Sequence, residues 1–153
     1  MTPHAIQTDL TTRFADIIPT SSWGETSFFY NPGAKLKRGV YFATIKEKDG
    51  ENDRASDLNR DGVWRFNLGL PPKLFEEHFG PRPARPAKGG IIAGDWAFTA
   101  ADVVTPHPVY GWMGWVAVLN PSKTTYEGLS DWISEAFGKA KMNAEKRILK
   151  EVG

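Results

Sequence analysis

A hydrophilic stretch at residues 57–62 has the residue types of a calcium-binding loop. Its sequence, DLNRDG, places Asp57, Asn59 and Asp61 at alternate positions before Gly62. Carboxylate and amide oxygens at this spacing converge on Ca²⁺, and the glycine allows the sharp turn that such a loop needs. The last position of the loop requires a bidentate glutamate, and here it is Leu68. Because the ion would lose its strongest ligand, the sequence favours a turn and predicts no metal site.

A second set of residues combines aromatic rings with an acid, an amide, an arginine and a histidine, as a binding site does. Its members are Trp23, Glu25, Arg65, Asn67, His107, Tyr110 and Trp112. Glu25 and His107 could form an acid–base pair, because histidine titrates near neutrality and a carboxylate can fix its tautomer. No nucleophile motif such as G-x-S-x-G accompanies them. We therefore expect these residues to bind a ligand, and we assign no catalytic residue.

A third feature is the loop PRPARPAKGG at residues 81–90, which carries Arg82, Arg85 and Lys88. Charges spaced by three along an extended backbone could contact successive phosphates, and the two glycines offer bare backbone amides. The loop matches neither of the common glycine-rich phosphate-binding motifs. A solvated connector is the favoured interpretation. Nucleic-acid binding is the alternative, aided by basic residues near the C-terminus: Lys139, Lys141, Lys146 and Arg147.

The elements that must position these residues follow from hydrophobic spacing and turn signals. Apolar residues at helical spacing predict a first helix over residues 3–17, and β-branched and aromatic runs around the NPGAK turn predict a hairpin. Further strands are expected at 63–70, 91–98 and 111–120, with helices over 72–79 and from residue 121. We expect an α+β fold, in which an antiparallel meander carries packed N-terminal and C-terminal helices.

Arg65 has a predictable direction within the strand 63–70. Trp64, Phe66 and Leu68 alternate with it, so Arg65 and Asn67 must project from the opposite face of the sheet. That face could be open to water, or a helix could cover it, in which case Arg65 would need a carboxylate such as Glu25. We favour a partly enclosed pocket, where Arg65, Asn67 and His107 present donors to an anionic or amide-bearing ligand.

The composition bounds the class of protein. The 153 residues suit one domain, and the expected core spans residues 3–137, with 138–153 as a basic helical extension or a frayed tail. The net charge of +1 gives no global attraction to nucleic acid, and the absence of cysteine excludes disulfides and thiol nucleophiles. No apolar run could span a membrane, and the N-terminus lacks the pattern of a secretory signal. We expect a cytoplasmic protein without a cofactor.

Several long strings give the chain a resemblance to known sequences. WGETSFFYNPG, FGPRPARPAKGG and HPVYGWMGWVAVLNPS are similar to a family of uncharacterised bacterial proteins of about this length, classed as a domain of unknown function. The order of helix, meander and closing helix also resembles, more distantly, the YjbR-like (MmcQ) family. That second resemblance implies an α+β fold and suggests DNA binding, but it assigns no residue here.

Three functions are compatible with these features. The favoured one is a non-enzymatic module that binds a small ligand or a protein through the aromatic and polar residues on one face of the sheet. The alternatives are a nucleic-acid-binding protein, which would use Arg82, Arg85 and Lys88, and a hydrolase-like enzyme with Glu25 and His107 as its acid–base pair.

Overall fold

The structure, a computed structural model, describes residues 1–152, and Gly153 lies outside them. In chain order the elements are α1 (Pro3–Arg13), β1 (Ile17–Ser22), β2 (Glu25–Tyr30), η1 (Pro32–Ala34), β3 (Val40–Lys46), β4 (Arg65–Gly69), α2 (Pro72–Phe79), β5 (Val104–Pro106), η2 (Gly111–Met113), β6 (Trp115–Leu119), α3 (Lys123–Gly128) and α4 (Ser130–Val152). The chain forms one α+β domain, as expected.

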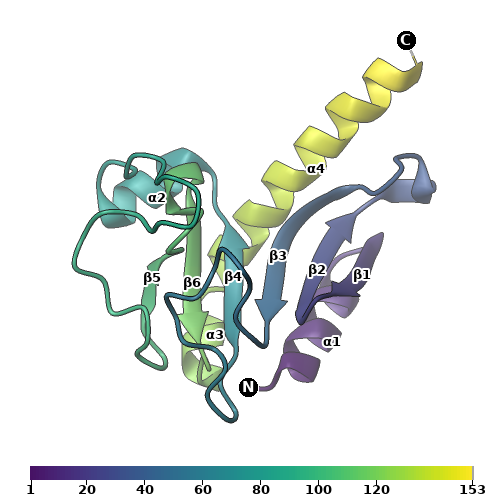
Figure 1. Cartoon of the computed structure of the whole chain (residues 1–153). Helices are drawn as coiled ribbons and strands as arrows, with labels where there is room; N and C mark the ends of the chain where they lie inside the picture. Colours follow the sequence, from purple (N-terminus) through teal and green to yellow (C-terminus); the bar gives the residue numbers. More distant parts are fainter. Residues whose placement is uncertain (153) are drawn as a thin grey trace.

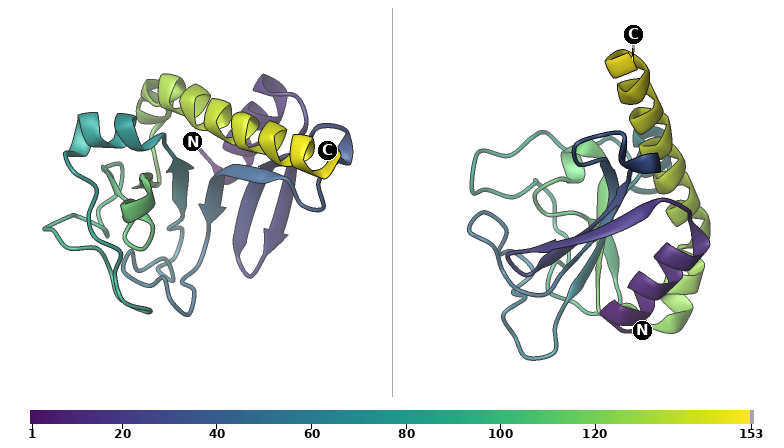
Figure 2. Two further views of the ribbon diagram at one scale, coloured as in Figure 1. Left: turned by 90° about the horizontal axis from the view of Figure 1, so that it is seen from above. Right: turned by 90° about the vertical axis from the view of Figure 1, so that its right-hand side faces the viewer.

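The strands form one antiparallel sheet in the order β1-β2-β3-β4-β6-β5. Helices α1, α3 and α4 lie on one face of this sheet, and long loops lie over the other face (Figures 1 and 2). The longest of these loops are residues 47–64 between β3 and β4 and residues 80–103 between α2 and β5. Of the helices within residues 1–152, none combines the length and the apolar character needed to cross a bilayer.

The main core lies between the sheet and the helices. Phe66 and Leu68 of β4 point into it, as the alternation predicted, and they are 1% exposed. Helix α4 contributes Ile133 and Ala136 from its own buried face. Because these strand residues occupy the helix-covered face, Arg65 and Asn67 lie on the loop-covered face.

The first helix is shorter than predicted. It begins as expected, with the Thr2 hydroxyl accepting a hydrogen bond from the Ala5 N–H at 3.0 Å. It ends at Arg13 and not at residue 17, and Asp16 takes a left-handed conformation (φ 64°) that turns the chain into β1. Strand β1 was missed because Pro19 resembles a helix stop. A proline is tolerated there, since β1 is an edge strand.

The strands near residues 91–120 also differ from the prediction. Residues 91–98 form no strand, although Ile92 and Phe98 are buried. The edge beside β6 is taken instead by the short β5, which places His107 immediately after it. Residues 111–113 form the 3-10 turn η2, and Gly114 (φ 93°) redirects the chain, so strand β6 starts only at Trp115.

The C-terminal residues continue α4 without a break at residue 137. Ala140 and Ala144 of this helix are buried, and Ala144 packs with Tyr30 and Leu36 in a small second cluster. The segment from residue 138 to 152 is therefore helical, and its inner face belongs to the core.

Candidate functional site

Polar residues form two rows across the loop-covered face of the sheet. In one row Ser27, Thr44 and Asn67 are cross-strand partners on β2, β3 and β4. In the next row Glu25, Lys46 and Arg65 are partners on the same strands. Thr44, Lys46, Arg65 and Asn67 are buried despite being polar. Buried polar side chains must find partners. Asn67 bonds to Thr44 within its row, and Arg65 reaches Asp53 and Ser56 of the loop above.

Arg65 lies at the centre of this polar layer and is fully buried. Its Nε donates to Asn67 Oδ1 at 2.7 Å, and its Nη1 donates to Asp53 Oδ1 at 3.0 Å and to Ser56 Oγ at 2.9 Å. Its Nη2 donates to Asp53 Oδ2 and lies 3.1 Å from His107 Nε2. The guanidinium therefore uses its donors within the protein and offers none to an anionic ligand.

Asp53 is the carboxylate that balances Arg65, and the sequence did not reveal it. It lies in the loop between β3 and β4 and makes a bidentate pair with the guanidinium. Burial alone would raise the pKa of Asp53, but the hydrogen bonds and charge of Arg65, with His107 and Lys46, outweigh burial and lower it. Glu25, the partner expected for Arg65 under a covering helix, does not pair with it, because a loop covers this face and supplies Asp53.

Glu25 forms an ion pair with Lys46 instead, with 3.8 Å between Oε1 and Nζ. Glu25 and His107 are not within ion-pair distance, and the carboxylate near the imidazole is Asp53, with Oδ2 at 3.9 Å from Nε2. The direct acid–base pair that the sequence suggested is therefore not formed. Its two members face the same cavity without touching each other.

His107 is 2% exposed, and its ring nitrogens are both engaged. Nδ1 accepts hydrogen bonds from the backbone N–H groups of Val109 and Tyr110, at 3.1 and 3.0 Å. Nε2 faces the Arg65 guanidinium. Burial lowers the pKa of His107 well below its ordinary value, the Arg65 and Lys46 charges lower it further, and Asp53 opposes them. The lowered pKa keeps the ring neutral at neutral pH, and because Nδ1 accepts from two N–H groups, the ring proton lies on Nε2.

A small cavity of about 110 Å³ lies above this buried layer. It is lined by Glu25, Ser27, Tyr41, Thr44, His107, Tyr110 and Trp115. Arg65 and Asn67 lie beneath it and do not line it, so they cannot present donors to a ligand there as we expected. The Thr44 hydroxyl accepts a hydrogen bond from Asn67 Nδ2 at 2.9 Å, which leaves its own proton free to donate.

The other two aromatic candidates lie elsewhere. Trp23 occupies the turn between β1 and β2 with φ 54° and is 88% exposed. Trp112 lies under the guanidinium of Arg85, whose Cζ is 4.7 Å from the ring centroid. The sequence therefore identified Glu25, His107 and Tyr110 of the cavity. The candidate set did not include Ser27, Tyr41, Thr44 or Trp115, whose inward direction depends on strand register.

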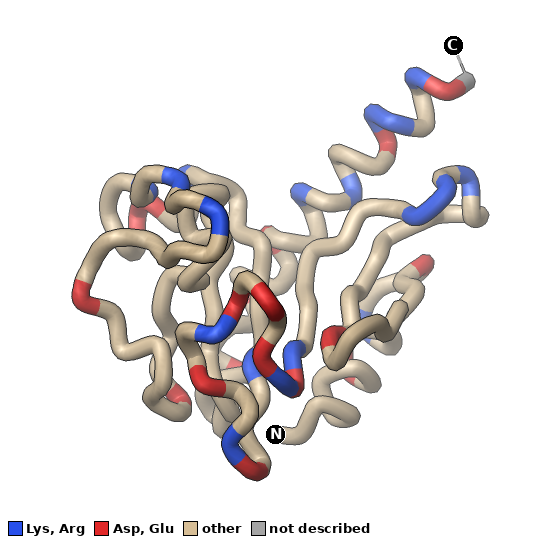
Figure 3. The backbone as a smooth tube through the Cα atoms, in the orientation of Figure 1, with Lys and Arg blue, Asp and Glu red and all other residues tan. Residues whose placement is uncertain are grey.

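The basic residues considered for nucleic-acid binding lie in two separate regions, the loop 81–90 and helix α4 (Figure 3). Arg82 forms an ion pair with Glu76 at 3.1 Å, and Arg85 stacks on Trp112, whereas Lys88 is exposed. Lys141, Lys146 and Arg147 are exposed on α4, on the opposite side of the sheet from the loops. Acidic residues lie among both sets.

The DLNRDG stretch is a turn held by internal hydrogen bonds. Asn59 Oδ1 accepts from the Asp49 N–H at 3.0 Å, and the Leu58 N–H donates to Asp49 Oδ1 at 2.8 Å. Asp57 (φ 53°) and Gly62 (φ 73°) take left-handed conformations. Within residues 1–152, no three His, Asp or Glu side chains gather where they could hold a metal.

Comparison with known proteins gives two matches. A family model described as a family of unknown function, DUF6194, matches residues 1–148. A protein from Pseudomonas syringae, whose crystal structure was determined by the Northeast Structural Genomics Consortium, is 14% identical in sequence. That match covers 92% of this chain and 99% of the other, with a TM-score of 0.48. No curated protein matches the chain.

Proposed function

The chain belongs to the DUF6194 family of unknown function, and we propose that it is a small-ligand-binding module whose ligand enters the cavity beside His107. The proposal rests on one observation. Three aromatic side chains, Tyr41, Tyr110 and Trp115, and one carboxylate, Glu25, line the same small cavity. Aromatic rings around a carboxylate are the groups that bind an ammonium cation in proteins.

The charges around the cavity support a cationic ligand over an anionic one. The buried arginine is already neutralised by Asp53, and His107 stays neutral because burial lowers its pKa. Glu25 is partly exposed, and its ion pair with Lys46 is long, with 3.8 Å between Oε1 and Nζ. Its other oxygen is therefore the available charged acceptor, and the hydroxyls of Ser27 and Thr44 can orient the polar part of a ligand.

The proposal can be tested with choline and its neutral isostere 3,3-dimethylbutanol, using NMR chemical-shift changes. Choline should bind saturably and more tightly than the isostere. The variant Glu25→Gln should weaken choline binding at least about tenfold, since it removes the charge from the cavity. Glu47→Gln removes the same charge from an exposed position nearby and should leave binding unchanged.

A second variant separates binding from folding. Tyr110 is exposed at the cavity mouth, so Tyr110→Leu should weaken choline binding while the unfolding temperature stays the same. Equal binding of choline and its isostere, or unchanged choline binding in both variants, would contradict the proposal.

The similarity to the YjbR-like family and the cytoplasmic location remain predictions from the sequence.

A further inference from the structure

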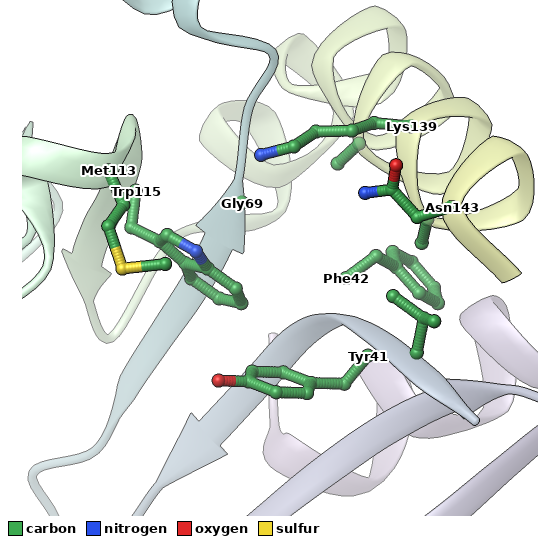
Figure 4. A pocket seen from close by; sticks show the side chains of 10 residues that line it. Tyr41, Phe42, Gly69, Met113, Trp115, Lys139 and Asn143 are labelled. Carbon is green, nitrogen blue, oxygen red and sulfur yellow. The ribbon is translucent and has the colours of Figure 1, made fainter. Parts of the chain in front are cut away.

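A second cavity, of about 140 Å³, lies at the end of the sheet beneath α4 (Figure 4). Tyr41 and Trp115 line both cavities, and their ring centroids are 5.4 Å apart. The remaining lining residues of the second cavity are Val40, Phe42, Gly69, Met113, Ala136, Lys139, Ala140 and Asn143. These contain no acidic side chain, so the two cavities differ in charge: the first has Glu25 and the second has Lys139.

Lys139 is a half-buried cation at the wall of this cavity. Its Nζ donates to the backbone oxygen of Leu70 at 3.2 Å, and within residues 1–152 no carboxylate oxygen lies within 4.0 Å of it. Burial lowers the pKa of Lys139, and the charge of Arg82 lowers it further. An ammonium in such surroundings is stabilised when an anion binds beside it.

Other hydrogen-bond donors face the same space. Gly69 is the cross-strand partner of Trp115, and a Cβ at position 69 would be 2.7 Å from the indole ring, so glycine lets this ring lie flat on β4. The indole N–H makes no hydrogen bond within residues 1–152. Asn143 lies one helical turn after Lys139, so its amide reaches the same cavity. Figure 4 shows Lys139, Asn143 and the indole nitrogen around the opening between α4 and the sheet.

The rest of the wall is apolar, formed by Phe42, Met113 and the alanines of α4. Donors at one end and apolar walls elsewhere are complementary to a small acid. We propose that this cavity is a second binding site, which holds a monocarboxylate with a compact apolar body. Its carboxylate pairs with the Lys139 ammonium and accepts from the Trp115 indole N–H and the Asn143 amide, while its body packs on Phe42 and Met113.

The test uses benzoate and its neutral analogue benzamide on the full chain. Binding is followed by the indole N–H resonance of Trp115, which the variant Trp115→Phe identifies. Benzoate should bind saturably and shift this resonance, and benzamide should bind at least about tenfold more weakly, the loss expected when a charge-assisted hydrogen bond becomes neutral. Equal binding of the two compounds, or no saturable binding of benzoate, would overturn the proposal.

Three variants complete the test. Lys139→Gln should weaken benzoate binding at least about tenfold, whereas Lys141→Gln, which removes an exposed charge two residues away, should have no effect. Asn143→Asp keeps the size of the side chain and places a carboxylate beside Lys139, so it should block benzoate without loss of thermal stability. Unchanged benzoate affinity in either Lys139→Gln or Asn143→Asp excludes the site. Glu25→Gln should leave benzoate binding intact, so the failure of one cavity is distinguishable from that of the other.

Discussion

At the scale of single residues, the centre of the molecule is a buried ion pair made by residues from different kinds of structure. Arg65 comes from the central strand β4, and Asp53 comes from a loop. The direction of Arg65 could be predicted, because alternation along a strand assigns each side chain to a face. The carboxylate that pairs with Arg65 could not be predicted, because nothing in the hydrophilic stretch 47–62 distinguishes Asp53 from the other acidic residues around it.

Replacing Arg65 with methionine should lower the free energy of unfolding by about 3–5 kcal/mol, because it leaves Asp53 partly buried without its counter-ion. Urea denaturation at neutral pH measures this loss. Arg38→Met, at an exposed position, should change stability by less than about 0.5 kcal/mol. The double variant Arg65→Met/Asp53→Leu should recover part of the loss. A loss below about 1 kcal/mol in the single variant would show that the pair is solvated.

His107 should make stability depend on pH in the mildly acidic range. Its pKa in the folded chain lies well below the ordinary value of 6.5, so the unfolded chain binds a proton that the folded chain does not. The stability is therefore fully present above about pH 6.5, and it falls below that pH by up to about 1.4 kcal/mol per pH unit. The pKa of Asp53 is lowered from 3.8, so protonation of this carboxylate reduces the stability only below about pH 3.8.

Urea denaturation at pH 7.5, 6.5 and 5.5, values chosen to bracket the titration of histidine at about 6.5, checks this expectation. His107→Gln should remove most of the pH dependence, and His78→Gln, at an exposed position, should keep it. A pH dependence that persists unchanged in His107→Gln would mean that the imidazole is protonated as easily in the folded chain as in the unfolded one.

At the scale of elements, the sequence predicted those helices and strands that have strong local sequence patterns. The strand at 63–70 and the helix at 72–79 were found, because strict alternation and a double proline are strong signals. The short strand β5 was not predicted. Its three residues, Val104–Pro106, are too few to show an alternation of apolar and polar residues, and they form a strand because they pair with β6. The sequence of the tail is compatible with either a helix or a frayed end, because its charged residues suit both.

The C-terminal half of α4 should contribute to stability through its buried face. Ala144 is fully buried against Tyr30 and Leu36, so Ala144→Glu would place a charge among apolar side chains and should cost more than about 2 kcal/mol. Met142→Glu is the matched control, because Met142 is 57% exposed, and it should change stability by less than about 0.5 kcal/mol. Thermal unfolding compares the two. Equal stability would mean that this part of α4 is not docked on the sheet.

At the scale of the whole molecule, the two faces of the sheet have different roles. The helix-covered face holds the apolar core, and the loop-covered face holds a buried polar layer beneath the first cavity. The candidate residues Glu25, His107 and Tyr110 line one cavity because β2, the end of β5 and the segment before η2 are brought together on this face. The sequence indicated which residues could belong to a site. Which of these residues lie close together depends on the order and register of the strands, and local sequence patterns do not reveal that order.

The distribution of charge over the whole molecule disfavours nucleic-acid binding. If Arg82, Arg85 and Lys88 each neutralised a phosphate of duplex DNA, the logarithm of affinity would fall with the logarithm of salt at a slope of about −2.7. Arg82 is already paired with Glu76 and Arg85 is stacked on Trp112, and the net charge is only +1. We therefore expect no saturable binding of a labelled duplex in fluorescence anisotropy at low salt. Binding with that slope, lost in the variant Arg82→Gln/Arg85→Gln/Lys88→Gln, would instead establish the proline-rich loop as a phosphate-binding surface.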